Sequence, residues 1–557
     1  MTNKLMNKII VVSLLAFFSL FGNNVLACSN FIITKGASID GSTMLSYTAD
    51  AGGFMEPLYI HEGGQHKADD SVAIYEWDSG WTKYLGKIKQ APITYRVIGN
   101  MNEWQLTIGE TTFGGRPELV DTTAIMDYGS LIYITLQRAR TAREAITIMT
   151  DLAEEYGYYS SGESISIVDP NEAWILEIIS KGKKEKGAVW VAKRVPDGHI
   201  AAHANKSRIR ELSENKDECI YSKDVISFAE QMGYYDRKSG KPFSFADAYD
   251  PEEPSNLFAC EGRVWVIYKK AAPSLNLSAD YFRAVKGAEP YPFSIKPDKK
   301  LGVKDVANIM RDHFENTEFD MTKGTAAGPF GCPYRWKPLG FKIEGDSNSY
   351  DWERPLSTQQ TAFSFISQAR SYMPREVGGV FWYGVDDNYS TVYTPLYCSI
   401  TKAPECFLNA DIANFNLNSA AWMFNLVANL AYQKYSYVIK DIQKEQSALE
   451  DKYLTYQTAI EKAAVELINT NRELGIEYLT EYSNSQAKNT MTKWTELWKQ
   501  LVMKYNDGYI NDVTKDKGRS PKGVGYGNDF FKQVVKERPG YYEMKWRNPI
   551  KSNKKKK

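Results

Sequence analysis

Cysteine is scarce in this sequence, which has six cysteines among 557 residues. A dense disulfide scaffold is therefore excluded, and the stability of the fold must come from a hydrophobic core. Setting aside Cys28, whose position is discussed below, leaves an odd number, so at least one thiol is expected to stay free. Cys398 and Cys406 are close enough in sequence either to bridge across a turn or to remain free, and Cys332 is predicted to be buried.

Histidine is scarcer still, with five residues. His199 and His203 lie four residues apart, but in a segment that is typical of a strand, and no His-Glu-x-x-His motif occurs. The helical zinc site of metalloproteases is therefore excluded, whereas a cysteine–histidine dyad that uses His203 stays open. The sequence also lacks a phosphate-binding glycine loop and a dinucleotide fingerprint. It predicts no metal and no cofactor.

Neither sign of charge is in excess, because 68 Lys and Arg balance 68 Asp and Glu. No global field favours binding to nucleic acid or to an anionic membrane. Basic residues gather only in 551–557, which we expect to be a solvated tail. With 43% hydrophobic residues, the chain is long enough for a large core and more than one structural unit, while its oligomeric state stays open.

No apolar run reaches the length of about 20 residues that a membrane-spanning helix requires. The first 27 residues instead have the pattern of a signal peptide. Lys4 and Lys8 supply a positive start, and residues 9–21 form an apolar run. Val25 and Ala27 put small residues at the third and first positions before a cut ahead of Cys28. The mature protein is therefore predicted to begin at Cys28 and to be exported, into the periplasm or the medium.

Strand and helix patterns alternate along the rest of the chain, which predicts an α+β fold of stacked sheets covered by helices. A capping box at Thr141–Glu144 divides a helical region over 129–156. The proline-free segment from 419 to about 505 predicts two or three long helices packed on the catalytic body. Strands are expected at 28–34, 43–47, 164–168, 173–179, 188–194 and 199–204, and a helix at 304–314. The predicted organisation is a signal peptide over 1–27, a catalytic domain over 28–410 and a mainly helical region with a basic tail over 411–557.

A cysteine at a cleavage point has three interpretations. As an N-terminal nucleophile, its thiol attacks an amide carbonyl while its own α-amine, with an ordinary pKa of about 7.7 to 8.0, acts as general base. As a lipoprotein anchor, the thiol of Cys28 is alkylated with diacylglycerol; as an ordinary cysteine, it has no special role. Phe31–Ile33 begin a core strand within three residues of Cys28, which leaves no flexible tether and favours the nucleophile.

The segment Cys28–Asp50 resembles the start of the PepD-type cysteine dipeptidases, which belong to the N-terminal-nucleophile (Ntn) hydrolases. The resemblance implies a four-layer αββα sandwich with a helical C-terminal region, and it places Cys28 at the end of a central strand. It continues in order to about residue 410, through the segments 101–112, 202–209, 311–317, 327–331 and 381–384.

The resemblance also implies roles for individual residues. Asp50 matches the acid that hydrogen-bonds the nucleophile's amine in the choloylglycine-hydrolase branch, where a carboxylate would orient and stabilise that amine. Asn205 matches the asparagine that helps to stabilise the oxyanion, a task that suits an amide donor. The alternatives are a solvated turn aspartate and a buried structural asparagine. Thr111 or Thr112 is expected to complete the oxyanion hole.

One departure from the family pattern lies three residues before the aspartate. Family members commonly have arginine there, whereas this chain has Tyr47. Cationic support for the thiolate or for a substrate carboxylate must then come from elsewhere. Arg208 and Arg263 are the candidates.

These observations predict an exported, metal-independent hydrolase of short peptides that forms an acyl-enzyme on Cys28. Asp50 would orient the amine and Asn205 would help to bind the oxyanion. Two alternatives stay open. One is a hydrolase of other linear amides, such as bile-salt conjugates or penicillin side chains; the other is a non-catalytic surface lipoprotein that binds peptides or glycans, which the departure at Tyr47 favours.

Overall fold

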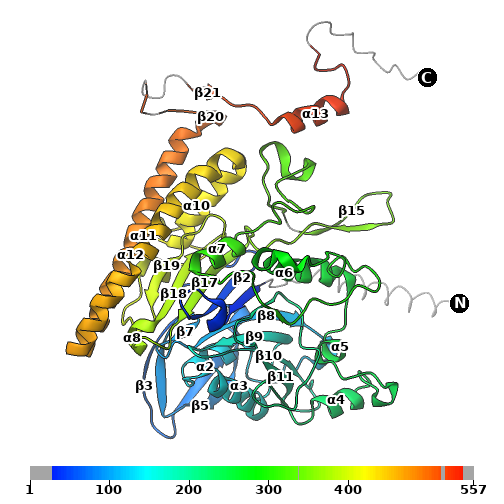
Figure 1. Cartoon of the computed structure of the whole chain (residues 1–557), viewed down its shortest axis with the longest axis vertical. Coiled ribbons are helices and arrows are strands. Elements are labelled where there is room, and N and C mark those ends of the chain that lie inside the picture. Colours follow the sequence, from blue (N-terminus) through cyan, green and yellow to red (C-terminus); the bar gives the residue numbers. More distant parts are fainter. Residues whose placement is uncertain (1–27, 337, 513, 516–520, 544–557) are drawn as a thin grey trace, which may run out of the picture.

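The computed structural model describes residues 28–543, apart from 337, 513 and 516–520 (Figure 1). The predicted signal peptide over 1–27 and the basic tail over 551–557 lie outside the described residues. The described chain mixes antiparallel sheets with helices, which confirms the predicted α+β class.

Two large antiparallel sheets form the centre of the described chain. Strands β1 and β2 of the first sheet contact β8 of the second, so the two sheets face each other. In spatial order, the first consists of β14 (Ser294–Ile295), β12 (Ile200–His203), β1 (Ser29–Ile33), β2 (Thr43–Asp50), β17 (Thr361–Ala369), β18 (Gly379–Val385) and β19 (Thr394–Tyr397). The second consists of β13 (Cys219–Tyr221), β11 (Ala188–Arg194), β10 (Ala173–Ser180), β9 (Gly162–Val168), β8 (Thr107–Gly114), β7 (Met101–Asn102), β6 (Ile93–Ile98) and β3 (Ile60–Gln65).

The two faces of the second sheet belong to different hydrophobic cores, as the two-residue period of a strand requires. Trp174 and Leu176 of β10 pack in a core with helices α2 (Tyr128–Leu136) and α3 (Ala142–Tyr156). Ile175 and Ile179 of the same strand pack in the core that includes the first sheet. A strand buried on both faces has no polar stripe, which is why the segment has an almost continuous apolar sequence.

Helices α2 (Tyr128–Leu136) and α3 (Ala142–Tyr156) cover the second sheet. The predicted division between them is confirmed, because the side chain of Thr141 accepts a hydrogen bond from the backbone of Glu144 at the start of α3. On the first sheet, α6 (Pro254–Ala271) contacts β12 and α7 (Val303–Met310) contacts β17. The remaining short elements are α4 (Val225–Gln231), α5 (Phe245–Tyr249), α8 (Arg375–Gly378), α9 (Glu405–Leu408), α13 (Asn528–Glu537), β4 (Ser71–Tyr75), β5 (Tyr84–Lys89), β15 (Gly340–Lys342), β16 (Ser349–Asp351), β20 (Tyr509–Ile510) and β21 (Lys522–Gly523).

Three long helices follow the sheets, as the sequence predicts: α10 (Ala420–Gln433), α11 (Tyr435–Thr470) and α12 (Arg472–Lys504). They pack beside β18 and β19 at one side of the molecule (Figure 1). Two buried ion pairs join α11 to the sheet-bearing body, Arg311 with Glu450 and Arg370 with Glu461. This confirms that the helices pack on the body, while a domain boundary at residue 410 stays a prediction.

The structure corrects or decides three detailed expectations from the sequence. The helix expected over 304–314 ends at Met310, because Arg311 turns toward Glu450 and the carboxylate of Asp312 accepts a hydrogen bond from the backbone of Phe314, 2.7 Å away. All six cysteines are free thiols among the described residues, so Cys398 and Cys406 form no bridge. Cys332 is half-buried rather than fully buried.

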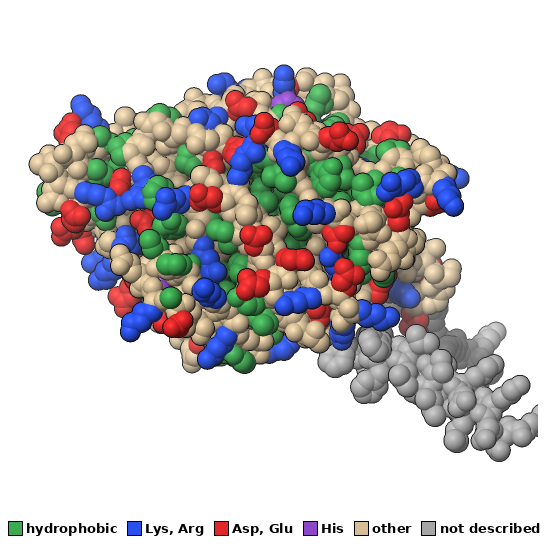
Figure 2. All heavy atoms as spheres, turned by 90° about the horizontal axis from the view of Figure 1, so that it is seen from below, with side chains coloured by type: hydrophobic (Ala, Val, Ile, Leu, Met, Phe, Trp, Pro, Cys, Tyr) green, Lys and Arg blue, Asp and Glu red, His purple; other side chains and the backbone are tan. Residues whose placement is uncertain are grey.

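The surface carries both signs of charge in close mixture. On the face shown in Figure 2, basic and acidic side chains alternate with polar and apolar ones, and neither sign forms a broad patch. This agrees with the balanced composition of the sequence. Within the described part of the chain, no helix has the length and apolar character needed to cross a membrane.

Candidate active site

Cys28 immediately precedes β1, a central strand of the first sheet. The register of β1 with β2 pairs Asn30 with Tyr47, so Cys28, Asn30 and Tyr47 share the face that looks toward β8. The side-chain amide of Asn30 donates to the carbonyl oxygen of Glu110 on β8 over 2.6 Å and fixes the two sheets at this point. The nucleophile candidate therefore lies between the two sheets.

The thiol of Cys28 is 2% exposed, and its Sγ lies 3.5 Å from the hydroxyl of Tyr47. Burial raises its pKa well above the ordinary value, and the negative charges of Glu110 and Asp50 act in the same direction. A neighbouring base and cation are therefore needed to form a thiolate here.

Arg263 of α6 supplies the cation. Its guanidinium donates to the carbonyl oxygen of Cys28 over 2.6 Å and to the hydroxyl of Ser29 over 3.0 Å. It also donates to the carbonyl of Ala204 and to the side-chain oxygen of Asn205. Burial, and next the charge of Arg354, lower the pKa of Arg263 to about 10, so it stays charged at neutral pH. Arg263, one of the two arginines that the sequence offers as cationic support, therefore contacts the backbone of Cys28.

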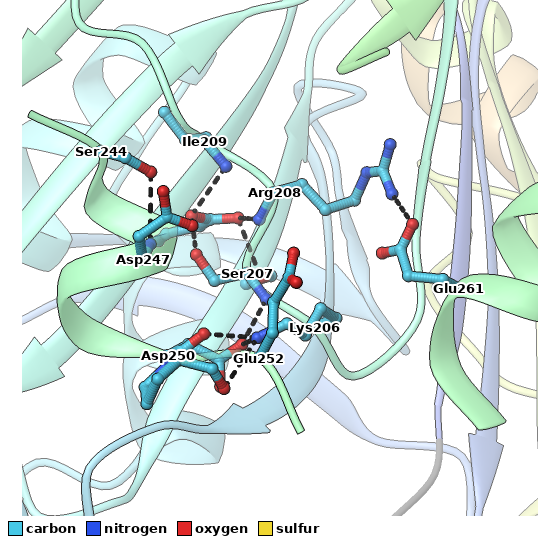
Figure 3. A network of polar contacts seen from close by, with 12 residues as sticks. Lys206, Ser207, Arg208, Ile209, Ser244, Asp247, Asp250, Glu252 and Glu261 are labelled. Carbon is cyan, nitrogen blue, oxygen red and sulfur yellow. Dashed lines mark hydrogen bonds and ion pairs between the residues drawn. The ribbon is translucent and has the colours of Figure 1, made fainter. Parts of the chain in front are cut away.

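Arg208, the other candidate, belongs to a structural network. Figure 3 shows its side chain extending to Glu261, with which it forms a 2.5 Å ion pair. It also donates to the carbonyl oxygens of Tyr291 and Pro292. The neighbouring Lys206 forms an ion pair with Asp250 in the same view. The guanidinium of Arg208 is therefore directed to scaffold contacts and not to Cys28.

Asp50 is fully buried at the end of β2, so it is not the solvated turn residue of the alternative interpretation. Three donors hold its carboxylate: the hydroxyl of Thr361 at 2.6 Å, the guanidinium of Arg354 at 2.7 Å and the hydroxyl of Thr48 at 2.9 Å. Its charge acts on the thiol of Cys28. The structure thus places the carboxylate of Asp50 near the thiol of Cys28, while its role toward the amine stays a prediction.

Asn205 follows β12 and adopts a left-handed backbone conformation with φ of 62°. Such a conformation is strained for most residues and is accepted by asparagine more readily than by others. Its side-chain nitrogen donates to the carbonyl oxygen of Thr112 over 2.8 Å, and its side-chain oxygen accepts from Arg263. Asn205 is therefore linked to Cys28 through Arg263.

Thr111 and Thr112 point to opposite faces of β8. The hydroxyl of Thr111 lies 2.7 Å from Nδ1 of His203, and Ser166 lies 2.7 Å from Nε2 of the same ring. Burial, and next the charge of Arg208, lower the pKa of His203 to about 3, so the ring is neutral. Both ring nitrogens are occupied by hydroxyl groups, which leaves the cysteine–histidine dyad without support from the geometry.

Sequence reasoning missed two buried carboxyls, Glu110 near Cys28 and Glu163 on the neighbouring strand β9. Glu110 accepts a 2.7 Å hydrogen bond from Tyr47, and Glu163 accepts one of 2.6 Å from the hydroxyl of Thr112. Burial raises the pKa of both, that of Glu163 well above its ordinary value. Glu110 occurs inside a segment that carries the family resemblance, but nothing in that segment distinguishes it from its neighbours. Its position on β8, which contacts β1, is what indicates a role.

Two cavities adjoin this constellation. The larger, with a volume of about 910 Å³, is lined by Thr112, Glu163 and Asn205 among others. The smaller is lined by Tyr47 and Glu110 together with several aromatic side chains. Among the residues that the structure describes, no three His, Cys, Asp or Glu side chains are arranged to hold a metal ion. The larger cavity thus reaches Asn205 and Glu163, and the smaller one reaches Tyr47 and Glu110, whereas Cys28 and Arg263 are not among the residues that line either cavity.

Comparison with known proteins identifies a peptidase family and several similar dipeptidases. The sequence model of the family described as "Peptidase family C69" matches residues 27–448. A "Probable dipeptidase" of Latilactobacillus sakei is 24% identical over 493 residues, which cover 86% of this chain and 95% of that protein. The "Dipeptidase A" of Lactobacillus helveticus is 23% identical over 439 residues, 73% of this chain and 82% of that protein. A "Probable dipeptidase" of Salmonella dublin is 25% identical over 389 residues, 67% of this chain and 81% of that protein.

The family match begins one residue before Cys28 and continues into α11. It covers most of the described chain, including both large sheets and every residue of the site above. The chain therefore belongs to peptidase family C69, a family of Ntn-type cysteine peptidases.

Proposed function

We propose that this protein is an exported cysteine dipeptidase whose mature chain begins with a free Cys28. The observation that carries the proposal is the placement of Cys28 at the start of a central strand, against the charged guanidinium of Arg263 and near the buried carboxylate of Asp50. The printed names of the relatives, all dipeptidases, support the reaction class. We assign the stacked sheets and their covering helices to the four-layer Ntn sandwich.

The reaction proceeds in two halves. The thiol of Cys28 gives its proton to its own α-amine, and the thiolate attacks the carbonyl carbon of the peptide bond. A carbon–sulfur bond forms, the carbon–nitrogen bond breaks, and the ammonium returns the proton to the departing amine. Water then gives a proton to the α-amine and attacks the thioester, which breaks the carbon–sulfur bond and releases the acid. The thiolate recovers its proton at the end.

The site residues assist this cycle in distinct ways. The positive charge of Arg263 favours the thiolate form of the buried thiol. Asp50, held by Thr361 and Arg354, stabilises the amine while it carries the proton. The amide of Asn205 turns from the carbonyl of Thr112 to the oxyanion.

The exported protein tests the proposal directly. We expect an intact mass and N-terminal sequence that start at an unmodified Cys28, and hydrolysis of Ala-Ala that is lost in Cys28→Ala. Cys219→Ala, a change of another buried cysteine on the far edge strand β13, should keep the activity. Activity of Cys28→Ala near the parent level would contradict the proposal, and so would a diacylglyceryl group on Cys28 of active protein.

Measurements on the same exported protein distinguish the two alternative functions. A hydrolase of other linear amides would cleave conjugated bile salts faster than dipeptides. A binding lipoprotein would carry lipid on Cys28 and cleave neither. The burial of Cys28 between the sheets supports the enzyme, because a lipid-bearing thiol at this place would have to leave the core.

A further inference from the structure

Glu110 and Glu163 are two buried carboxyls that the cycle above does not use. They lie on neighbouring strands, β8 and β9, where the register pairs Thr112 with Glu163. Glu110 is two residues from Thr112 along β8, so both glutamates are on the same face of the sheet. Glu110 is 2% exposed and Glu163 is fully buried. The two form a diagonal cross-strand pair of like groups, an arrangement that is destabilising when both are ionised.

No basic side chain of the described chain forms an ion pair with either glutamate. One oxygen of each accepts a hydrogen bond from a neutral hydroxyl, that of Tyr47 or that of Thr112. The Oε2 atoms of both are buried and receive no hydrogen bond from a described donor. The two carboxyls act directly on each other, and Asp78 adds further negative charge. Buried carboxyls without a cation are costly, so such a pair calls for a positive ligand.

The pair adjoins both the nucleophile and the open cleft. The hydroxyl of Tyr47 contacts the thiol of Cys28 and also donates to Glu110. Glu163 lines the cleft of about 910 Å³, and Glu110 lines the smaller cavity beside Tyr47. Glu110 thus connects the pair to the nucleophile through Tyr47, and Glu163 connects it to the larger cavity.

We propose that Glu110 and Glu163 form the subsite that binds the free α-ammonium group of the substrate residue whose carbonyl Cys28 attacks. The inference rests on the proposed dipeptidase function and names its recognition chemistry. In a dipeptide the α-nitrogen is attached to the carbon next to the attacked carbonyl carbon, so the group that binds it must adjoin the nucleophile. Without substrate, one proton shared by the two carboxyls reduces the repulsion between them. When the ammonium of the substrate binds, this proton leaves to solvent and the ammonium donates charge-assisted hydrogen bonds to the carboxylates.

Substrate pairs that differ only in the ammonium group test the subsite. The mature enzyme should cleave Ala-Ala at least about 100-fold more efficiently, in kcat/KM, than N-acetyl-Ala-Ala. Alanine amide should inhibit competitively, whereas propionamide, which lacks the amine, should not at the same concentration. Equal cleavage of the free and the acetylated peptide would overturn the subsite and leave the proposed dipeptidase function intact. A mature enzyme with a free Cys28 that cleaves no dipeptide would overturn both.

The variant Glu163→Gln keeps the shape of the side chain and removes its charge. It should lower kcat/KM for Ala-Ala about 100-fold, mostly through KM, and leave cleavage of N-acetyl-Ala-Ala unchanged. The rate of Cys28 alkylation by iodoacetamide should stay close to that of the parent, which shows that fold and nucleophile are preserved. Glu62→Gln, the same change at an exposed position on β3, is the matched control. Parent-level activity of Glu163→Gln on Ala-Ala would overturn the assignment, and so would loss of parent activity in a chelator with recovery on adding a divalent cation.

Discussion

At the scale of single residues, Tyr47 stands where the family resemblance implies an arginine, and a cation reaches Cys28 from another element. A tyrosine at this position places a neutral hydroxyl between Cys28 and Glu110 instead of a positive charge. Burial raises the pKa of Tyr47 well above its ordinary value, so it stays neutral and can donate. The positive charge comes instead from Arg263, which reaches the backbone of Cys28 from α6.

Asn205 offers a residue-scale test, because its left-handed backbone and its amide can be separated. Asn205→Gly keeps the φ of 62° without strain and removes the amide, whereas Asn205→Ala removes the amide and adds backbone strain of about 1–3 kcal/mol. Both should lose on the order of 100-fold in kcat if the amide binds the oxyanion. Only the Ala variant should also unfold at a lower temperature than the Gly variant. A loss of only a few-fold in kcat for Asn205→Gly would identify a structural asparagine.

At the scale of elements, α11 is joined to the sheet-bearing body by ion pairs of two kinds. The carboxylate of Glu450 is buried, pairs with Arg311 at 2.6 Å and accepts from the backbone of Tyr393. The next residue, Asp451, pairs with Lys304, and both side chains are about half exposed. Neighbouring positions on one helix thus differ in burial while they share the type of interaction.

This difference predicts unequal effects of the same substitution. Glu450→Ala should lower the free energy of unfolding by about 3–5 kcal/mol, because it leaves the buried Arg311 without its partner. Asp451→Ala should change it by at most about 1 kcal/mol, since solvent screens an exposed pair. Urea denaturation of the parent and both variants measures the difference. Equal losses would mean that the burial of Glu450 does not determine its contribution.

At the scale of the whole molecule, buried carboxyls make stability depend on pH. Asp386, which follows β18, has one oxygen bonded by Asn425 of α10 at 3.0 Å and the other buried without a hydrogen-bond partner among the described residues. Burial raises its pKa from 3.8 to about 7. A raised pKa in the folded state means that its contribution is fully present below pH 3.8 and is lost as the pH rises through 7.

Asp386→Asn should therefore remove part of the dependence of the free energy of unfolding on pH. Asparagine accepts the left-handed φ of 65° and keeps an oxygen for Asn425, but it does not ionise. Relative to the parent, the variant should gain stability between pH 4 and pH 7, at about 1.4 kcal/mol per unit of pKa shift removed. Denaturation midpoints measured at several pH values provide the comparison. A constant difference between variant and parent across this range would contradict the assignment.

The sequence by itself determined the features that depend on local pattern. The turn residues between them located β9, β10 and β11, the capping box at Thr141 located the start of α3, and a proline-free run located α10 to α12. Cys28 was identified from its place before a core strand, and its neighbours carried the resemblance to the family. These signals are contained in short segments, so no tertiary contact is needed to interpret them.

Only the tertiary structure decided which charged groups meet the nucleophile. Arg208 and Arg263 are both buried arginines, and only the packing of α6 on β12 brings Arg263 to Cys28 while Glu261 holds Arg208. Glu110 and Glu163 are more than 50 residues apart, and the register of β8 and β9 makes them neighbours. Pairing of distant strands and the burial that shifts a pKa are set by the whole chain, because they depend on which surfaces the two sheets exclude from water.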